Sequence, residues 1–136
     1  MRVFLDANIL FSAAKSDGAV RQLLKRLGEL GHEFWVDPYV VAEARRNLQA
    51  KGAHAIEVLD ALLSHLHVAR TLPSAVDTPA TQWLPEKDRP VLASAIALRC
   101  NALVTGDRSH FGSGYGHRVE GVALHSPRSL AEALLT

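Results

Sequence analysis

The sequence is poor in three features that often define the class of a protein: cysteine, net charge and long apolar runs. Among 136 residues there is one cysteine, Cys100, which excludes an internal disulfide framework and fits a reducing compartment. The formal net charge of +1 does not indicate a strongly charged partner, although basic groups can still gather locally. No apolar run approaches the ~20 residues of a membrane span, and Asp6 interrupts the apolar N-terminus, which argues against a signal peptide. We therefore expect a soluble, cytoplasmic protein with no membrane partner.

What the chain does contain is the composition of an ordinary globular protein, with 48% hydrophobic and 21% charged residues. Its length suits one domain over residues 1–136. Short β-like runs alternate with longer helical segments, which predicts a three-layer α/β/α fold around a central parallel sheet of about five strands. The predicted strands are 2–5, 32–36, 67–72, 102–105 and 121–125. The predicted helices are 18–30, 39–50, 53–66, 89–100 and a last one from residue 127, with loops at 73–85 and 109–116.

Two acidic residues follow apolar strands directly. Asp6 comes after the first predicted strand and Asp107 after the fourth. In a doubly wound α/β sheet, ligands collect at the carboxyl ends of the strands, so these side chains share one edge if the two strands are neighbours. One such acid is commonly a turn former or a cap, but two of them favour a functional site.

Two further acids have a plain structural explanation. Asp88 precedes the apolar helix 89–100, where an acid serves as N-cap or first-turn residue. That helix also points its N-terminus toward the same edge of the sheet, so capping and function are compatible. For Glu43, in the helix 39–50, the pattern alone favours a solvated residue paired with Arg46 or Asn47.

Carboxylates that converge repel one another, and a hard divalent cation removes that conflict. Mg²⁺ and Mn²⁺ take oxygen ligands and keep several waters, whereas structural zinc would call for cysteine and histidine. A metal held by acids lowers the pKa of water and stabilises the transition state of phosphodiester cleavage. The residues alone therefore indicate a metal-assisted hydrolase if these acids meet.

Four segments resemble the PIN-domain family of compact metal-dependent ribonucleases, which includes the VapC-type toxins of toxin–antitoxin pairs. They read "FLDANILFSA", "VDPYVVAEARRNL", "LPEKDRPVLASAIALRCNALVTGDRSHFG" and "VALHSPRSLAEAL", and they cover nearly the whole chain in order. The most specific part is "KDRPVLASAI" followed by "LVTGDRSHF". The resemblance implies a parallel sheet flanked by helices and an endoribonuclease that uses Mg²⁺ or Mn²⁺ to cleave RNA. It also implies a homodimer and an antitoxin partner that covers the cleft.

The resemblance also assigns residues. The family's acidic quartet of catalytic metal ligands falls on Asp6, Glu43, Asp88 and Asp107. Thr105 occupies the family's small polar position two residues before the last Asp.

Several residues near the quartet have candidate roles around it. Asn8 is the polar residue that follows Asp6, and Asn8 and Thr105 are expected to orient the neighbouring carboxylates. Some members carry a further acid after the last Asp, where this chain has Arg108, Ser109 and His110, so the occupancy of a second metal stays open. His110 is a candidate for contact with RNA or metal. The candidates for RNA phosphate contacts are Arg45, Arg46, Lys87, Arg89 and Arg108.

Other functions stay open at this point. One is a catalytically quiet PIN-like module that binds RNA or protein. Another is a phosphatase with an aspartyl nucleophile at Asp6, although such enzymes normally carry a second Asp at the position of Asn8. Parts of the predicted helices 18–30 and 53–66 are candidates for a groove that accepts a second copy or an antitoxin. The sequence does not identify the RNA target or the cleavage site.

Overall fold

The computed structural model describes residues 1–70 and 78–135, and a mostly parallel sheet of six strands forms its centre. The strand order is β3-β2-β1-β4-β6-β5, with β5 antiparallel to β6 and all other neighbours parallel. The strands are β1 (Arg2–Leu5), β2 (Glu33–Val36), β3 (His67–Val68), β4 (Ala102–Val104), β5 (Arg118–Val119) and β6 (Val122–His125).

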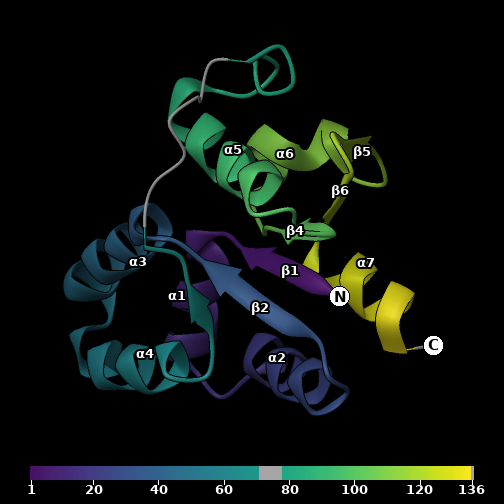
Figure 1. The fold of residues 1–136 in the computed structure, drawn as a ribbon. Coiled ribbons are helices and arrows are strands. Elements are labelled where there is room, and N and C mark those ends of the chain that lie inside the picture. The colour runs from purple at the N-terminus through teal and green to yellow at the C-terminus, as the bar shows by residue number, and fades with distance from the viewer. Residues whose placement is uncertain (71–77, 136) are drawn as a thin grey trace.

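Helices cover both faces of the sheet, which confirms the predicted three-layer fold. In Figure 1, helices α5 (Arg89–Ala97) and α6 (Arg108–Phe111) lie above the sheet, and α2 (Ala19–Glu29) and α4 (Ile56–Leu63) lie below it. The other helices are α1 (Ala7–Lys15), α3 (Pro38–Lys51) and α7 (Pro127–Leu135), with 3-10 turns η1 (Ala53–Ala55), η2 (Glu86–Asp88) and η3 (Gly112–Gly114). Within the described ranges, no helix combines the length and apolarity that a membrane crossing needs.

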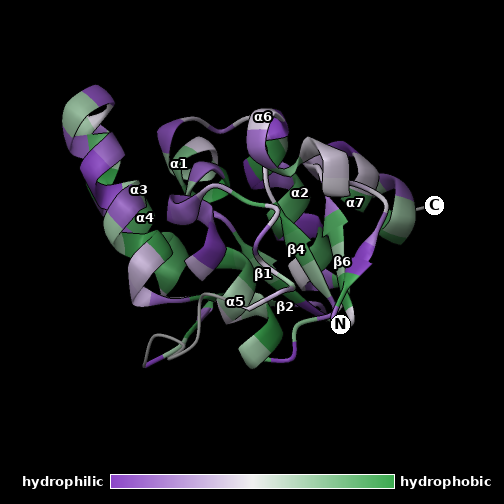
Figure 2. Cartoon of the chain, turned by 90° about the horizontal axis from the view of Figure 1, so that it is seen from above, coloured by the Kyte–Doolittle hydropathy of each residue, from purple (hydrophilic) through white to green (hydrophobic). Residues whose placement is uncertain are grey.

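The two central strands supply much of the core. Every residue of β4, and the last three residues of β1, are at most 1% exposed. A strand that is covered on both faces reads as a continuous apolar run, which is why both strands were predictable from the sequence. Figure 2 shows β1, β4 and β6 as largely apolar ribbons enclosed by helices that alternate between hydrophilic and apolar residues.

The pairing of the central strands places the predicted acids side by side. Leu5 of β1 pairs with Val104 of β4, and the backbone N–H of Asp6 donates to the carbonyl of Val104 at 3.1 Å. Asp6 and Thr105 therefore continue the two strands at the same carboxyl edge.

Several predicted boundaries were wrong. The third strand ends at Val68, not residue 72, and the last residues of that prediction and the first of the 73–85 loop lie outside the described residues. Helix α1 was not predicted. It follows β1 directly, and Asp6 is its N-cap, with a side chain that accepts a hydrogen bond from the Ala7 N–H. Strand β5 was also missed. It forms a two-residue hairpin with β6 through Glu120 and Gly121, both at positive φ (50° and 85°), as a type I′ turn requires.

The predicted loop 109–116 is instead the short helix α6 followed by η3. Gly114 is packed, because a Cβ added there would lie 2.5 Å from Leu124 Cδ1 and 2.7 Å from Trp83 Cη2. Phe111, three residues earlier, is fully buried, with its ring edge-on to that of Trp83. Gly114 thus permits close packing of Leu124 and Trp83 next to α6, the helix that Asp107 caps and that carries His110 of the candidate site.

Candidate active site

Asp6 lies at the junction of β1 and α1, where it is only 5% exposed. Its Oδ1 accepts a hydrogen bond from the backbone N–H of Ala7 at 2.7 Å, and its Oδ2 accepts one from the Thr105 hydroxyl at 2.8 Å. The pKa of Asp6 is raised to about 6, chiefly by burial and also by the nearby charges of Glu43 and Asp88, against the lowering effect of these hydrogen bonds. A cation beside Asp6 would offset the cost of its negative charge.

Thr105 and Asn8 connect the two strand ends. The Thr105 hydroxyl donates to Asp6 and accepts from Asn8 Nδ2 at 3.2 Å and from the Asp107 backbone N–H at 3.1 Å, which uses its full hydrogen-bonding capacity. Asn8 Nδ2 lies 3.3 Å from Asp6 Oδ2, and its Oδ1 accepts from the Gly106 N–H at 2.8 Å. This network fixes the β1–α1 and β4–α6 junctions relative to each other.

Asp88 and Asp107 face each other across one imidazole. Asp107 caps α6 through its Oδ1, which accepts from the His110 backbone N–H at 3.2 Å. Asp88 occupies the N-cap position of α5, but its side chain makes no capping hydrogen bond. Its Oδ2 lies 2.7 Å from His110 Nδ1, and Asp107 Oδ2 lies 2.8 Å from the same nitrogen. The capping explanation of Asp88 is therefore wrong for its side chain, which turns toward the site.

This trio has the geometry of a ligand set. One ligand atom from each of Asp88, Asp107 and His110 lies within 4.8 Å of the others. Asp88 Oδ2 and His110 Nδ1 are buried atoms that find no partner with hydrogen-bond geometry in the described part of the chain. Burial raises the pKa of Asp88, His110 and Lys87 oppose that rise, and the charge of Asp107 adds to it. The donor set, rich in carboxylate oxygens, fits a divalent cation.

Glu43 approaches the site from α3, where it is half-buried. Its charge raises the pKa of Asp6, so the electrostatic field of Asp6 includes both Glu43 and Asp88. One helical turn earlier, the Tyr39 hydroxyl donates to the Lys87 carbonyl at 2.6 Å and so connects α3 to η2. Burial raises the pKa of Tyr39, and the charges of Glu43 and Asp88 add to the effect. The charges of Glu43 and Asp88 thus act on Asp6, and that of Asp107 acts on Asp88, so the four acids of the predicted quartet influence one another electrostatically.

Sequence reasoning missed two residues that support this site. Tyr39 lies one helical turn before Glu43, and this i,i+4 spacing puts both on one helix face. Asp37, which directly follows β2, is fully buried. Its Oδ1 accepts from the Val40 N–H at 3.0 Å, and its Oδ2 accepts from the Ser94 hydroxyl of α5. Nothing local in the sequence signals that second contact, because Ser94 is remote along the chain.

The predicted cationic residues divide into two groups. Lys87 lowers the pKa of Asp88, Arg46 lowers that of Tyr39 and Arg108 lowers that of Tyr115, so these three charges border the site. Arg45 instead pairs with Asp60 of α4 at 2.5 Å, and Arg89 Nε donates to the Leu84 carbonyl at 3.0 Å. The structure therefore brings three of the five toward the quartet.

A comparison with protein-family models identifies the class of protein to which this fold and site belong. The model of the PIN domain matches residues 2–109. The chain belongs to the PIN-domain family. No curated protein sequence gives a significant match.

Solved structures show the same fold at low sequence identity, and 17 chains match significantly. VapBC2 from Rickettsia felis, bound to a DNA fragment from its promoter, has a TM-score of 0.65 and 18% identity, over 93% of this chain and 98% of that one. VapBC-1 from nontypeable Haemophilus influenzae has a TM-score of 0.64 and 15% identity, over 94% and 99%. The Mycobacterium tuberculosis toxin VapC20, which cleaves the sarcin–ricin loop, has a TM-score of 0.61 and 15% identity, over 87% and 97%.

Proposed function

We propose that this protein is a metal-dependent endoribonuclease whose catalytic residues are Asp6, Glu43, Asp88 and Asp107. The observation that supports the proposal is the grouping of Asp88, Asp107 and His110, whose ligand atoms lie within 4.8 Å of one another. The charges of Glu43 and Asp88 also act on the buried Asp6. Membership of the PIN-domain family supports the proposal. Asp88 Oδ2 and His110 Nδ1 are buried and contact each other at 2.7 Å without hydrogen-bond geometry, and a bound Mg²⁺ or Mn²⁺ would give both a partner.

Each residue has a defined task in this proposal. Asp6, Asp88 and Asp107 hold the cation, which when bound lowers the pKa of water and offsets the charge of the phosphodiester. Glu43 orients the attacking water and accepts its proton. Thr105 and Asn8 fix the orientation of the Asp6 carboxylate through the hydrogen bonds described above.

Substrate contacts come from the cations at the border of the site. Lys87, Arg46 and Arg108 bind backbone phosphates on either side of the scissile bond. Such contacts carry no sequence information by themselves, so they fit cleavage at a position that RNA shape selects. In-line attack of water leaves 5′-phosphate and 3′-hydroxyl ends.

The test is cleavage of a fluorescent RNA pool by the purified chain with Mn²⁺, with Mg²⁺ and with a chelator. We expect cleavage with either metal, and none with the chelator or in Asp107→Asn and Glu43→Gln. Asp60→Asn, an acid outside the site, is the matched control and should cleave normally. RNA binding without cleavage under all metal conditions would instead identify a quiet binding module and overturn the proposal.

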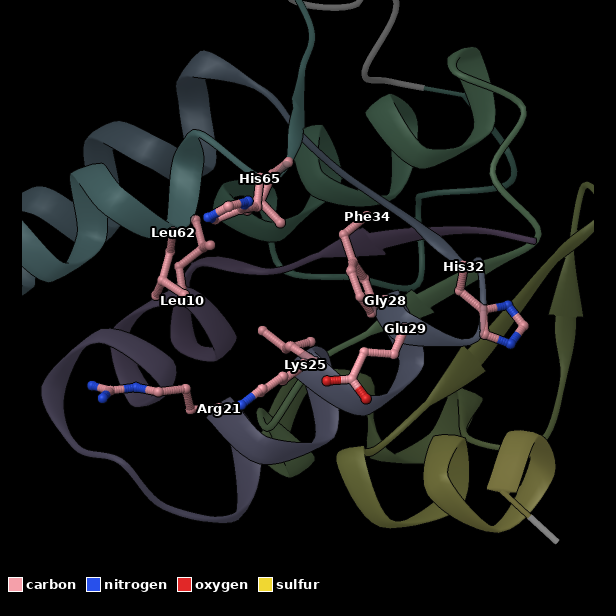
Figure 3. Close-up of a pocket in the computed structure, with 11 residues that line it drawn as sticks. Leu10, Arg21, Lys25, Gly28, Glu29, His32, Phe34, Leu62 and His65 are labelled. Atoms are coloured by element: carbon pink, nitrogen blue, oxygen red, sulfur yellow. The ribbon is translucent and has the colours of Figure 1, made fainter.

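We further propose that the protein is the toxin of a toxin–antitoxin pair. A second surface supports this: an apolar groove of about 630 Å³ between α2, α4 and β2. Leu10, Leu24, Phe34, Leu62 and Leu66 form its apolar lining. Figure 3 shows Arg21 and Lys25 at one end of this groove and Glu29 farther along α2.

The residues that line the groove indicate the kind of segment that would bind there. Apolar walls beside two cations complement a segment with apolar anchors and an acidic residue, and we assign the groove to such a segment of an antitoxin. Expression of the chain in bacteria should arrest growth, and co-expression of the product of a neighbouring small gene should relieve the arrest. In Leu62→Asp, relief should fail while RNA cleavage by the purified chain persists. A dimer by light scattering that Leu62→Asp dissociates would instead assign the groove to a second copy.

A further inference from the structure

The imidazole of His110 contacts both Asp88 and Asp107, where it could take part in binding a metal ion. It lies on α6, three residues after Asp107, and the fully buried ring of Phe111 anchors the next position. Its backbone N–H is held by Asp107 Oδ1 at 3.2 Å, which fixes the start of this short helix. The side chain is 30% exposed, yet Nδ1 itself is buried and faces both carboxylates.

The distances suit three ligands of one cation. Two ligand atoms at right angles and about 2.1 Å from a common ion lie about 3.0 Å apart. His110 Nδ1 is 2.7 Å from Asp88 Oδ2 and 2.8 Å from Asp107 Oδ2. Shifts of a few tenths of an ångström would therefore bring both contacts of His110 to the spacing of a coordination shell, and the three ligand atoms all lie within 4.8 Å of one another.

We propose that His110 Nδ1 is a direct metal ligand together with Asp88 and Asp107, and that this nitrogen makes the site prefer first-row transition-metal ions to Mg²⁺. The inference rests on the proposed metal-dependent function. Mg²⁺ favours oxygen ligands and water, whereas an imidazole nitrogen strengthens binding along the series from Mn²⁺ to Co²⁺. In this chain the nitrogen stands where an all-acid site would supply another oxygen.

The alternative role of His110, as a counter-charge to the carboxylates, predicts the opposite change in metal affinity when the imidazole is removed. If His110 serves as a positively charged partner of the two carboxylates, it competes with every cation for them. Removal of the imidazole would then tighten binding of Mn²⁺, Co²⁺ and Mg²⁺ alike. Removal of a ligand instead weakens the binding of transition ions selectively, so the two roles are separable by binding alone.

The experiment is calorimetric titration of the purified full chain with Mn²⁺, Co²⁺ and Mg²⁺, without substrate. In wild type we expect affinity to rise from Mg²⁺ through Mn²⁺ to Co²⁺. His110→Ala should weaken Mn²⁺ and Co²⁺ binding by about tenfold or more, a loss no smaller than that for outer-shell partners, and should change Mg²⁺ binding far less. His110→Asp should restore an oxygen donor and reduce the preference for Co²⁺ over Mg²⁺. His117→Ala, which removes an exposed histidine outside the trio, should leave all affinities unchanged.

A spectroscopic measurement on the wild type avoids any question of folding. Mn²⁺ bound to the chain should show the ¹⁴N hyperfine coupling of a coordinated imidazole in pulsed electron paramagnetic resonance, and His110→Asp should lack it. Mn²⁺ bound without that coupling, or equal affinities in His110→Ala and wild type, overturns the role of His110 while the proposed function stands. Failure of the wild type to bind any of the three ions at millimolar concentration overturns both.

Discussion

Replacement of Asp6 by asparagine should abolish RNA cleavage and yet stabilise the metal-free protein at neutral pH. The carboxyl group is 5% exposed, and its pKa rises from 3.8 to about 6 on folding, chiefly through burial. A rise of about two pKa units corresponds to a cost of about 3 kcal/mol for holding the ionised form in the folded state. Asparagine is never ionised and avoids that cost.

The sign of the pH dependence follows from the direction of the pKa shift. Between pH 3.8 and about 6 the folded state binds more protons at Asp6 than the unfolded state does. Its contribution to stability is therefore fully present below pH 3.8 and is lost as pH rises through about 6. Asp88, whose pKa is also raised by burial, adds a loss in the same direction.

The stability that Asp6→Asn gains is smaller than the free-energy cost of the ionised carboxylate, because asparagine disturbs the hydrogen bonds at this position. Oδ2 of Asp6 accepts hydrogen bonds from the Thr105 hydroxyl and from Asn8 Nδ2. An amide nitrogen at this position would itself be a donor and could not accept them. Loss of those hydrogen bonds costs about 1–2 kcal/mol. We therefore expect Asp6→Asn to be more stable than wild type by about 1–2 kcal/mol at pH 7.5 with a chelator present.

The assay is urea denaturation of both proteins with EDTA at intervals from pH 4 to pH 8. Asp17→Asn, an exposed acid that accepts a hydrogen bond from Gln22, is the matched control and should follow wild type. The advantage of Asp6→Asn should shrink as pH falls below about 6. An Asp6→Asn variant that is equally destabilised at every pH would refute the reasoning, because the site would then not strain an ionised carboxylate.

Three further changes have expected outcomes. Ser94→Ala should destabilise the protein by about 1–3 kcal/mol in urea denaturation, because it leaves the fully buried Asp37 without one hydrogen-bond partner. A loss below about 0.5 kcal/mol would contradict the hydrogen bond between Ser94 and Asp37. Thr105→Val should weaken Mn²⁺ binding by about 10–100-fold in calorimetry, while Thr105→Ser, which keeps the hydroxyl, should stay near wild type. Gly114→Ala should destabilise the protein by about 1–3 kcal/mol through overpacking. Gly28→Ala, with open space around the added methyl group, should stabilise the protein by up to about 1 kcal/mol. Equal changes in melting temperature for the two variants would contradict the packing at Gly114.

The parallel sheet and its acidic edge were accessible from the sequence because both depend on short-range patterns. Buried parallel strands appear as uninterrupted apolar runs, and Asp6 and Asp107 each follow such a run. Their proximity required only that β1 and β4 be neighbours, which the pairing of Leu5 with Val104 shows.

Other parts of the site depended on contacts that no local pattern encodes. The pattern alone gave Glu43 a solvated role, and only the family resemblance connected it with Asp6. Asp37 depends on a serine 57 residues away along the chain, and Tyr39 on a backbone carbonyl of η2. His110 was flagged by its closeness to Asp107 in sequence, but its position between two carboxylates follows from the short helix α6, which was predicted as a loop.

The most direct test of the account is the anomalous difference map of a crystal grown with Mn²⁺. The account predicts a strong peak in contact with carboxylate oxygens of Asp6, Asp88 and Asp107. A peak elsewhere on a protein that cleaves RNA would contradict the account. So would undiminished RNA cleavage in solution after every divalent ion has been removed.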